Sequence, residues 1–255
     1  MKTKIIKTKK LEVKKSELKT NANFSKDSIK FLSDLEKNNN RNWFLENKEK
    51  YIQFIKSPLL SLAEDLRKDF GEAHVYRPNR DMRFSKDKKP YKTRASFYIE
   101  IGVGGYYFQI DKNSILIGGG LYDPQPDQLL NFRNIFKGQN LNSQNDAIKD
   151  SVNKNAASID RVIKNLNKIG FELMGQNDLK TAPRGFDKNS QYIKHLQKKS
   201  LAMSKTYELG EFAYTADLLK IVKSDFKILR EWNEIINKNV GPTKIVRTFG
   251  LSDRG

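Results

Sequence analysis

The sequence predicts an α+β fold: a single domain in which an antiparallel β meander packs against several α-helices. Short runs that alternate apolar and polar residues, as strands do, are grouped in the middle of the chain. Longer segments with apolar residues every three or four positions, as on one face of a helix, lie before and after that group. Because these segments flank the strands and do not alternate with them, the pattern favours α+β over a doubly wound sheet.

The helices before the meander are bounded by recognisable caps. The first begins after Ser25 and ends at three consecutive asparagines, residues 38–40, one of which can cap the next helix. That next segment places Trp43 and Tyr51 on one side, which favours core packing of a helix pair. Another helix is predicted over residues 58–71, with a proline in its first turn and a glycine at its end.

The meander is predicted from three alternating runs, at residues 95–101, 106–111 and 115–117, with a shorter strand at 73–76. In the first two runs the apolar residues share one face, which we expect to be buried. The other face is polar and aromatic. It is therefore either solvated or lines a cleft.

Helices dominate the remainder of the chain. We predict them at 123–136, 143–153, 158–170, from Tyr192 to Leu201, and at 215–238.

The composition predicts one domain over residues 23–238, because nothing between them marks a linker. Residues 1–22 form a predicted basic, flexible arm, whose first twenty positions hold eight lysines against Glu12 and Glu17, and residues 239–255 a loose C-terminal tail. The formal net charge is +18, so the body is basic as well. Such a charge favours anionic partners, although abundant lysine and asparagine also suit a merely solvated surface.

Other classes are disfavoured. The chain has no cysteine, hence no disulfide, thiol nucleophile or thiolate metal site. No apolar run approaches the roughly 18 residues that a membrane span needs, and no signal peptide is visible. We therefore expect a soluble, cytoplasmic protein without a cofactor, whose oligomeric state the sequence leaves open. The two histidines, His74 and His195, lack metal-ligand spacing, and His195 is expected at the surface.

The densest charge lies in the run RPNRDMRFSKDKKPYK, residues 77–92. Seven of its residues are basic against two aspartates: Arg77, Arg80, Arg83, Lys86, Lys88, Lys89 and Lys92, with Asp81 and Asp87. The pattern RDxRFSKDKxPYK within this run resembles the signature of a widespread family of conserved hypothetical proteins, found mainly in bacteria and fungi and catalogued as a domain of unknown function. Similar motifs at 39–51, 118–122 and 180–185 extend the resemblance over most of residues 25–235. The resemblance implies no biochemical role.

Arginine offers paired donors that match phosphate or carboxylate oxygens, and lysine adds a point charge. We therefore predict an anion site in a cleft between the meander and the helices, if the fold brings the two basic motifs together. The candidate contacts are Arg80, Arg83, Lys86, Lys88, Lys92, Arg94, Lys180 and Arg184, with Asp81, Tyr91, Gly119, Gly120 and Tyr122 in support. Whether chemistry follows binding is open.

Several alternatives remain. The arginines can pair internally in a structural or interaction protein, or the basic body can contact a nucleic-acid backbone with tyrosines stacking on bases. A metal-dependent nuclease would draw its ligands from Asp81, Asp87, Glu100, Asp111 and Asp123. Tyr91 is either an activated phenol or a packed ring. The glycines at 118–120 serve either close approach of a ligand or strand, or a turn that needs positive φ.

Overall fold

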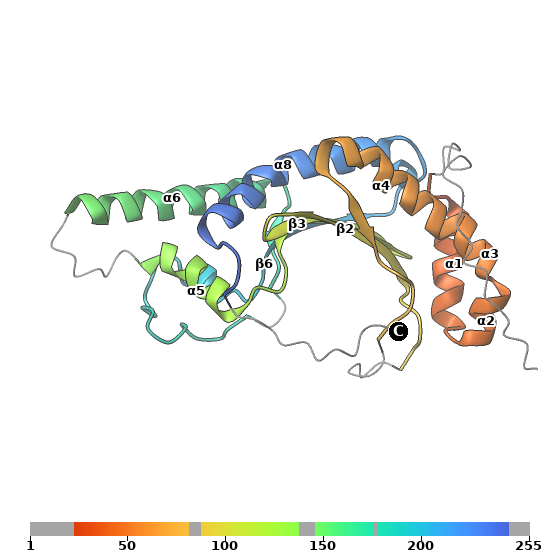
Figure 1. The fold of residues 1–255 in the computed structure, drawn as a ribbon, viewed down its shortest axis with the longest axis horizontal. Helices are drawn as coiled ribbons and strands as arrows, with labels where there is room; N and C mark the ends of the chain where they lie inside the picture. Colours follow the sequence, from red (N-terminus) through yellow and green to blue (C-terminus); the bar gives the residue numbers. More distant parts are fainter. Residues whose placement is uncertain (1–22, 82–87, 138–145, 176–177, 245–255) are drawn as a thin grey trace, which may run out of the picture.

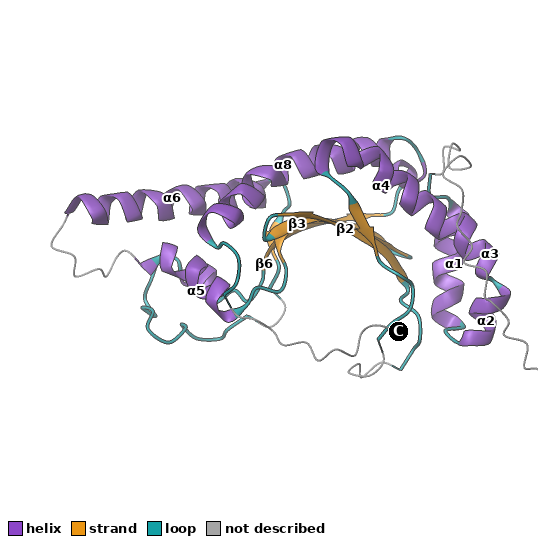
Figure 2. Cartoon of the chain, viewed as in Figure 1, coloured by secondary structure: helices purple, strands orange, loops and turns teal. Residues whose placement is uncertain are grey.

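The computed structural model of the chain describes residues 23–81, 88–137, 146–175 and 178–244. Figures 1 and 2 show its helices: α1 (Lys26–Lys37), α2 (Arg41–Glu46), α3 (Lys48–Tyr51), the π-helix η1 (Ile52–Lys56), α4 (Ser57–Phe70), α5 (Pro126–Ile135), α6 (Asp146–Lys168), α7 (Ile193–Leu196), the 3₁₀-helix η3 (Glu211–Tyr214) and α8 (Asp217–Asn239). The strands are β1 (Ala73–Val75), β2 (Arg94–Ile101), β3 (Gly104–Asp111), β4 (Ser114–Leu121), β5 (Glu172–Leu173) and β6 (Leu201–Glu208).

The six strands form one antiparallel sheet in the order β1-β2-β3-β4-β6-β5. Strands β2, β3 and β4 are consecutive neighbours, so the predicted meander is confirmed. Helices precede and follow this meander, which confirms the α+β class.

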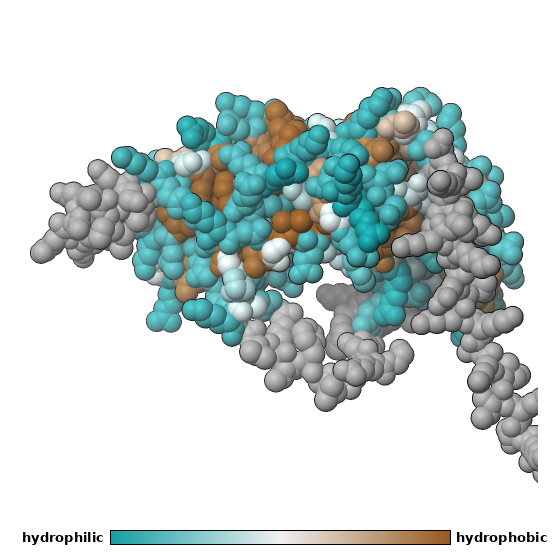
Figure 3. All heavy atoms as spheres, turned by 45° about the horizontal axis from the view of Figure 1, so that its top comes forward, coloured by the Kyte–Doolittle hydropathy of each residue, from teal (hydrophilic) through white to brown (hydrophobic). Residues whose placement is uncertain are grey.

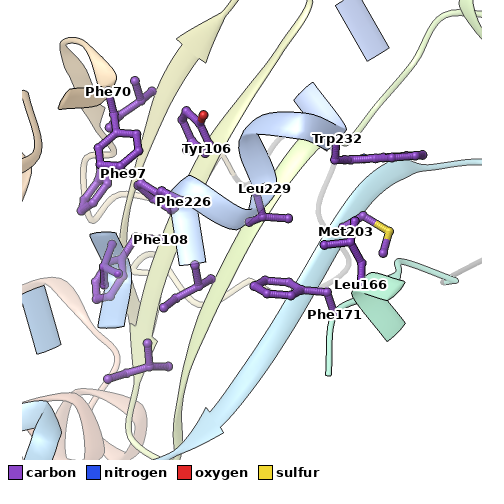
Figure 4. Close-up of a cluster of buried hydrophobic side chains, with 14 of the residues drawn as sticks. Phe70, Phe97, Tyr106, Phe108, Leu166, Phe171, Met203, Phe226, Leu229 and Trp232 are labelled. Atoms are coloured by element: carbon purple, nitrogen blue, oxygen red, sulfur yellow. The ribbon is translucent and has the colours of Figure 1, made fainter. Parts of the chain in front are cut away.

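Helices α4, α6 and α8 lie on the same side of the arched sheet (Figure 1). Alternate residues of β2 and β3, including Phe97 and Phe108, point to that side and are fully buried. Figure 4 shows Phe226, Leu229 and Trp232 of α8 packing over the strands. Each such side chain contributes about 1.5–3 kcal/mol when fully buried. Seen from the helix side, the described surface is mostly hydrophilic, with apolar side chains showing between the helices (Figure 3).

Polar side chains of α8 fix the helix to one end of the sheet. The indole Nε1 of Trp232 donates to the carbonyl of Leu201 at 2.9 Å. The side-chain oxygen of Asn233 accepts the N–H of Gly120 at 3.0 Å. Asn237 makes two more hydrogen bonds, of 3.1 and 2.8 Å, to the turn between β2 and β3. These directed contacts set the position of α8 more narrowly than apolar packing alone.

The N-terminal helices pack as the sequence predicts. Asn40 caps α2 by accepting the N–H of Trp43 at 3.0 Å, and the ring of Phe31 contacts the rings of Trp43 and Tyr51. The chain then stays helical from α3 through η1 into α4. The helix predicted to begin at residue 58 is therefore a continuation of the preceding turns.

The helix predicted from Tyr192 to Leu201 is wrong. Helix α7 covers only four residues, and β6 begins at Leu201. The strand is hard to recognise because Lys205 occupies a position on its core face, where the alternation would require an apolar residue. The ammonium of Lys205 lies over the rings of Phe171 and Tyr207, 5.6 and 4.8 Å from their centroids.

The chain remains attached after α8. The carboxylate of Asp127 in α5 accepts the hydroxyl of Thr243 at 2.8 Å and the N–H of Lys244 at 2.7 Å. These bonds hold the chain beyond residue 239, where the sequence predicts a loose tail. The predicted arm at residues 1–22 and the tail from residue 245 lie outside the described residues.

Candidate functional site

The face of the sheet opposite α4, α6 and α8 carries polar and aromatic side chains. No described helix lies across this face between α5 and the N-terminal helices α1, α2 and α3 (Figure 1). The strand registers place six of its residues side by side on β1, β2 and β3, and we call them the open face: His74, Tyr76, Ser96, Tyr98, Tyr107 and Gln109. This is the face that the sequence predicts as solvated or as the lining of a cleft.

The ring of Tyr76 contacts two other rings of the open face. The Tyr76 ring centroid lies 5.4 Å from that of His74 and 6.5 Å from that of Tyr107. Ser96 is the direct neighbour of Tyr76 across the β1–β2 pair and is only 4% exposed. Within the described part of the chain its hydroxyl has no hydrogen-bond partner. The open face therefore presents ring surface above a buried hydroxyl.

The β1–β2 pair continues into the basic run. The N–H groups of Arg80 and Lys92 each donate at 2.8 Å to a carbonyl of the facing segment. Side chains of an extended pair alternate between faces, so Lys92 lies on the same side as Arg94 and the open face, while Tyr91 points to the other side. Lys92 and Arg94 thus lie along the open face, on an extension of the β1–β2 pair.

Tyr91 holds this extension in place. Its backbone exchanges two hydrogen bonds of 2.9 Å with the side-chain amide of Asn39. Its buried ring stacks on Phe44 at a centroid distance of 3.9 Å. The packed-ring interpretation of Tyr91 is confirmed, and the residue positions the basic run.

Four cations gather where the extension meets the open face, and we call Arg77, Arg80, Lys92 and Arg94 the basic corner. The Lys92 ammonium donates to the carbonyl of Arg77 at 3.3 Å and lies 5.2 Å from the Tyr76 ring centroid. Partial burial, followed by the positive charges of Arg94, Arg77 and Arg80, lowers the pKa of Lys92. Among the described residues no carboxylate forms an ion pair with Arg77, Lys92 or Arg94. Clustered like charges of this kind attract an anion.

The acidic residue opposite Arg94 is hydrogen-bonded to the following turn. Arg94 faces Asp111 across the β2–β3 pair, but that carboxylate accepts two backbone N–H groups of the following turn, at 2.8 and 2.9 Å. Burial is the main cause that raises the pKa of Tyr98 to about 12, and burial also raises the pKa of Tyr76. Both tyrosines are neutral at physiological pH, and the Tyr98 hydroxyl donates to the carbonyl of Gly104 at 2.6 Å, at the end of the sheet away from Arg94.

The second basic motif does not join this cluster. Lys180 and Arg184 follow β5, which forms the opposite edge of the sheet from β1. Four strand spacings of about 4.8 Å separate β2 from β5. Both side chains are exposed. The two basic motifs, which the sequence analysis groups in one candidate site, therefore lie in different parts of the structure. Of the other candidates, Arg83 and Lys86 lie outside the described residues, while Asp81 and Lys88 are described and exposed.

The glycines at the end of β4 serve helix packing. Gly120 has a φ of +105°, and a Cβ on Gly119 would lie 3.2 Å from the Cβ of Leu229 in α8. The interpretation as a positive-φ position is confirmed for Gly120. Both glycines, and Tyr122, which is 63% exposed, lie at the end of the sheet away from Arg94.

Acidic residues and histidines form no metal cluster in the described ranges, where no group of three or more His, Asp or Glu side chains is placed to hold an ion. Asp87, one candidate ligand of the nuclease hypothesis, lies outside those ranges. The expectation that His195 is a surface residue is wrong. Its side chain is 14% exposed, and its Nε2 lies 2.9 Å from Asp160 in α6.

A family model described as conserved hypothetical protein (DUF2461) matches residues 27–234. The chain belongs to this family. No curated protein and no solved structure matches the sequence of this chain. In this DUF2461 protein, the open face and the basic corner both lie within the matched residues. No helix in its described part combines the length and apolar character needed to cross a bilayer.

Sequence reasoning missed part of the site in this DUF2461 protein. Arg77 belongs to the basic run but not to the predicted contacts, and the open-face residues were expected only as an unassigned polar, aromatic face. The period-two alternation in 95–101 and 106–111 contains the signal for Ser96, Tyr98, Tyr107 and Gln109. The position of Tyr76 beside Ser96 depends on how β1 pairs with β2, which the alternation does not specify.

Proposed function

We propose that the protein binds a phosphate-bearing small molecule at the basic corner. The observation that carries the proposal is the position of Lys92: its ammonium is partly buried, donates to the Arg77 carbonyl at 3.3 Å, lies 5.2 Å from the Tyr76 ring centroid and is close to the positive charges of Arg94 and Arg77. Among the described residues no carboxylate pairs with this ammonium. Bringing cations together costs free energy, which a bound anion offsets. The proposal takes the protein to be cytoplasmic, where phosphorylated metabolites are abundant.

The composition of the corner suits phosphate. Guanidinium groups bind two phosphate oxygens at once through parallel N–H donors, and such charge-assisted bonds are stronger than neutral ones. Arg94 can approach a ligand from β2 and Lys92 from the extension. The neutral hydroxyl of Tyr76 adds a donor that does not repel an anion.

The test is a calorimetric titration of the full chain with inorganic pyrophosphate at 0.15 M KCl. We expect the variants Arg94→Gln and Lys92→Gln to weaken binding at least about tenfold, which corresponds to about 1.4 kcal/mol. Arg161→Gln is the matched control, because Arg161 is an exposed arginine on α6 and its replacement changes the net charge equally. Equal weakening in the control, or no binding by the wild type, would refute the proposal.

The net charge of +18 favours a second candidate function, binding to a nucleic-acid backbone. Salt distinguishes the two candidates. Binding through many backbone phosphates weakens steeply, with a logarithmic slope near 0.9 per neutralised phosphate on duplex DNA. Binding of a single phosphate group at the basic corner should weaken much less with salt, with the logarithmic slope expected for one or two phosphate contacts.

A further inference from the structure

Tyr76, a residue of the open face, also contacts the basic corner. Tyr76 carries the Lys92 ammonium over its face and contacts the rings of His74 and Tyr107 on the open face. It remains 39% exposed. A ligand whose phosphate reaches Lys92 therefore lies next to an aromatic surface.

Hydrogen-bonding groups border this aromatic surface. Ser96 and Gln109 are direct cross-strand neighbours on β2 and β3. The Gln109 side-chain oxygen accepts the Tyr107 hydroxyl at 3.0 Å, while its amide nitrogen has no partner in the described ranges. The Ser96 hydroxyl lies beneath this surface and is buried. The Gln109 amide, beside rings that meet edge to face, can hydrogen-bond the polar edge of a flat heterocycle.

A phosphate without a ring would leave this surface unused. Aromatic side chains bind bases by stacking with little dependence on sequence, because every base presents a π-face, and the edges of a base need donors and acceptors nearby. Gln109 pairs with Ser96, two residues from Arg94 along β2, and Tyr76 is the neighbour of Ser96 on the other side. The Lys92 ammonium lies 5.2 Å from the Tyr76 ring centroid, so one ligand that carries both a phosphate and a base can contact the cation and the ring.

We propose that the ligand is a nucleotide unit, with its phosphate at the basic corner and its base against the rings of Tyr76 and Tyr107. This inference rests on the proposed function, since it assigns the phosphate to the same cations. The unit can be a free mononucleotide or one residue of a single strand, and the two sources share this chemistry.

The test compares the affinities of ribonucleoside 5′-monophosphates with that of ribose 5-phosphate, which lacks only the base. We expect at least one nucleotide to bind the full chain at least about tenfold more tightly than ribose 5-phosphate. Tyr107→Leu should reduce this preference to about twofold or less while leaving ribose 5-phosphate binding unchanged. Tyr76→Leu should reduce the preference and also weaken ribose 5-phosphate binding, because Tyr76 offers its hydroxyl to the phosphate and its ring to Lys92. Tyr107 is the second variant because Lys92 lies over Tyr76 and not over Tyr107.

Tyr122→Leu is the matched control, since it removes an exposed tyrosine ring at the other end of the sheet. If ribose 5-phosphate binds as tightly as every nucleotide, or if Tyr122→Leu abolishes the preference as well, the inference is overturned. If no phosphate compound depends on Arg94, the proposed function itself fails. A ten-residue single-stranded DNA distinguishes the sources, because a strand should bind more tightly than a mononucleotide and show the steeper salt dependence.

Discussion

Asn39 and Tyr91 lie 52 residues apart in the sequence, and the side-chain amide of the first closes a pair of hydrogen bonds with the backbone of the second, both of 2.9 Å. Asn39 belongs to the turn between α1 and α2, and Tyr91 to the basic run. The pair therefore connects the N-terminal helices to the segment that carries the candidate site.

We predict that Asn39→Ala lowers the free energy of unfolding by about 1–3 kcal/mol, because it leaves two partly buried backbone groups without partners. Urea denaturation followed by circular dichroism measures the change. Asn38→Ala is the control: its side chain makes one exposed hydrogen bond, to Asp34, so we expect an effect within about 0.5 kcal/mol. Equal effects in the two variants would show that the pair does not hold the basic run.

The charge on Lys92 is predicted to cost stability. Its pKa is lowered, so the folded state disfavours the ammonium form, and at neutral pH this charge opposes folding. Lys92→Met keeps the apolar stem and removes the charge, so we expect stability to stay level or to rise by up to about 1 kcal/mol. The gain should shrink as salt screens the cluster.

Thermal unfolding at 0.05 and 0.5 M KCl checks the Lys92 prediction. Lys30→Met is the control, since Lys30 is an exposed lysine on α1, and it should show little dependence on salt. A loss above about 2 kcal/mol in Lys92→Met would favour the structural hypothesis, in which the basic residues stabilise the fold.

The elements that the sequence predicts well are those in which one periodicity dominates. Residues 95–101 and 106–111 alternate cleanly and form β2 and β3, and the apolar period of 215–238 gives α8. Lys205 breaks the alternation of β6 because its ammonium lies over aromatic rings of the core face, a packing that no local pattern predicts.

The candidate site was likewise only partly predictable from the sequence. The charge of the basic run is visible in the sequence, but its neighbours are set by strand order. Lys92 and Arg184 belong to two separate motifs of the resemblance, yet the strands beside them, β2 and β5, lie near opposite edges of the sheet. The sequence left the cap of α2 open between Asn39 and Asn40; Asn40 is the cap, and the bond of Asn39 to Tyr91 depends on a contact across 52 residues.

Buried Asp225 gives a pH-dependent prediction. It is buried in α8 and accepts the Tyr207 hydroxyl at 2.7 Å. Burial raises the pKa of Asp225 despite that bond and the nearby Lys205, so its stabilising contribution exists at low pH and is lost as pH rises through the folded-state pKa. We expect Asp225→Asn to be more stable than the wild type at pH 7, by a margin that shrinks as pH falls toward 3.8, the unperturbed pKa of aspartate.

The control for Asp225 is Asp217, whose pKa is shifted in the opposite direction. The hydrogen bond from Lys220 lowers the pKa of Asp217, so that residue stabilises at neutral pH and its contribution is lost as pH falls through the lowered pKa. Asp217→Asn should therefore be less stable than the wild type at pH 7, with the difference closing in acid. Denaturation series at pH 4, 5.5 and 7 measure both variants, and parallel curves for the two would contradict the assignment.

The close approach of α8 to the sheet is tested by two glycines that both have a positive φ. Gly120 and Gly185 both have positive φ, +105° and +83°. A Cβ on Gly120 would lie 2.4 Å from the Leu201 carbonyl oxygen and 2.7 Å from the Trp232 indole nitrogen, whereas a Cβ on Gly185 would meet nothing within 4 Å. Alanine at Gly185 should therefore cost only the backbone strain, about 1–2 kcal/mol.

Gly120→Ala should cost at least about 2 kcal/mol more than Gly185→Ala, because the backbone of β6 and the indole of α8 must both move. Denaturation of the two variants measures the difference, and the near-ultraviolet circular dichroism of Trp232 should change only in Gly120→Ala. Similar losses of stability in the two variants would mean that φ strain alone accounts for the cost of alanine at position 120. They would also mean that α8 can shift to make room for the added methyl group. A large excess for Gly120→Ala would show that the end of β4 is committed to helix packing and that its glycines serve the contact with α8.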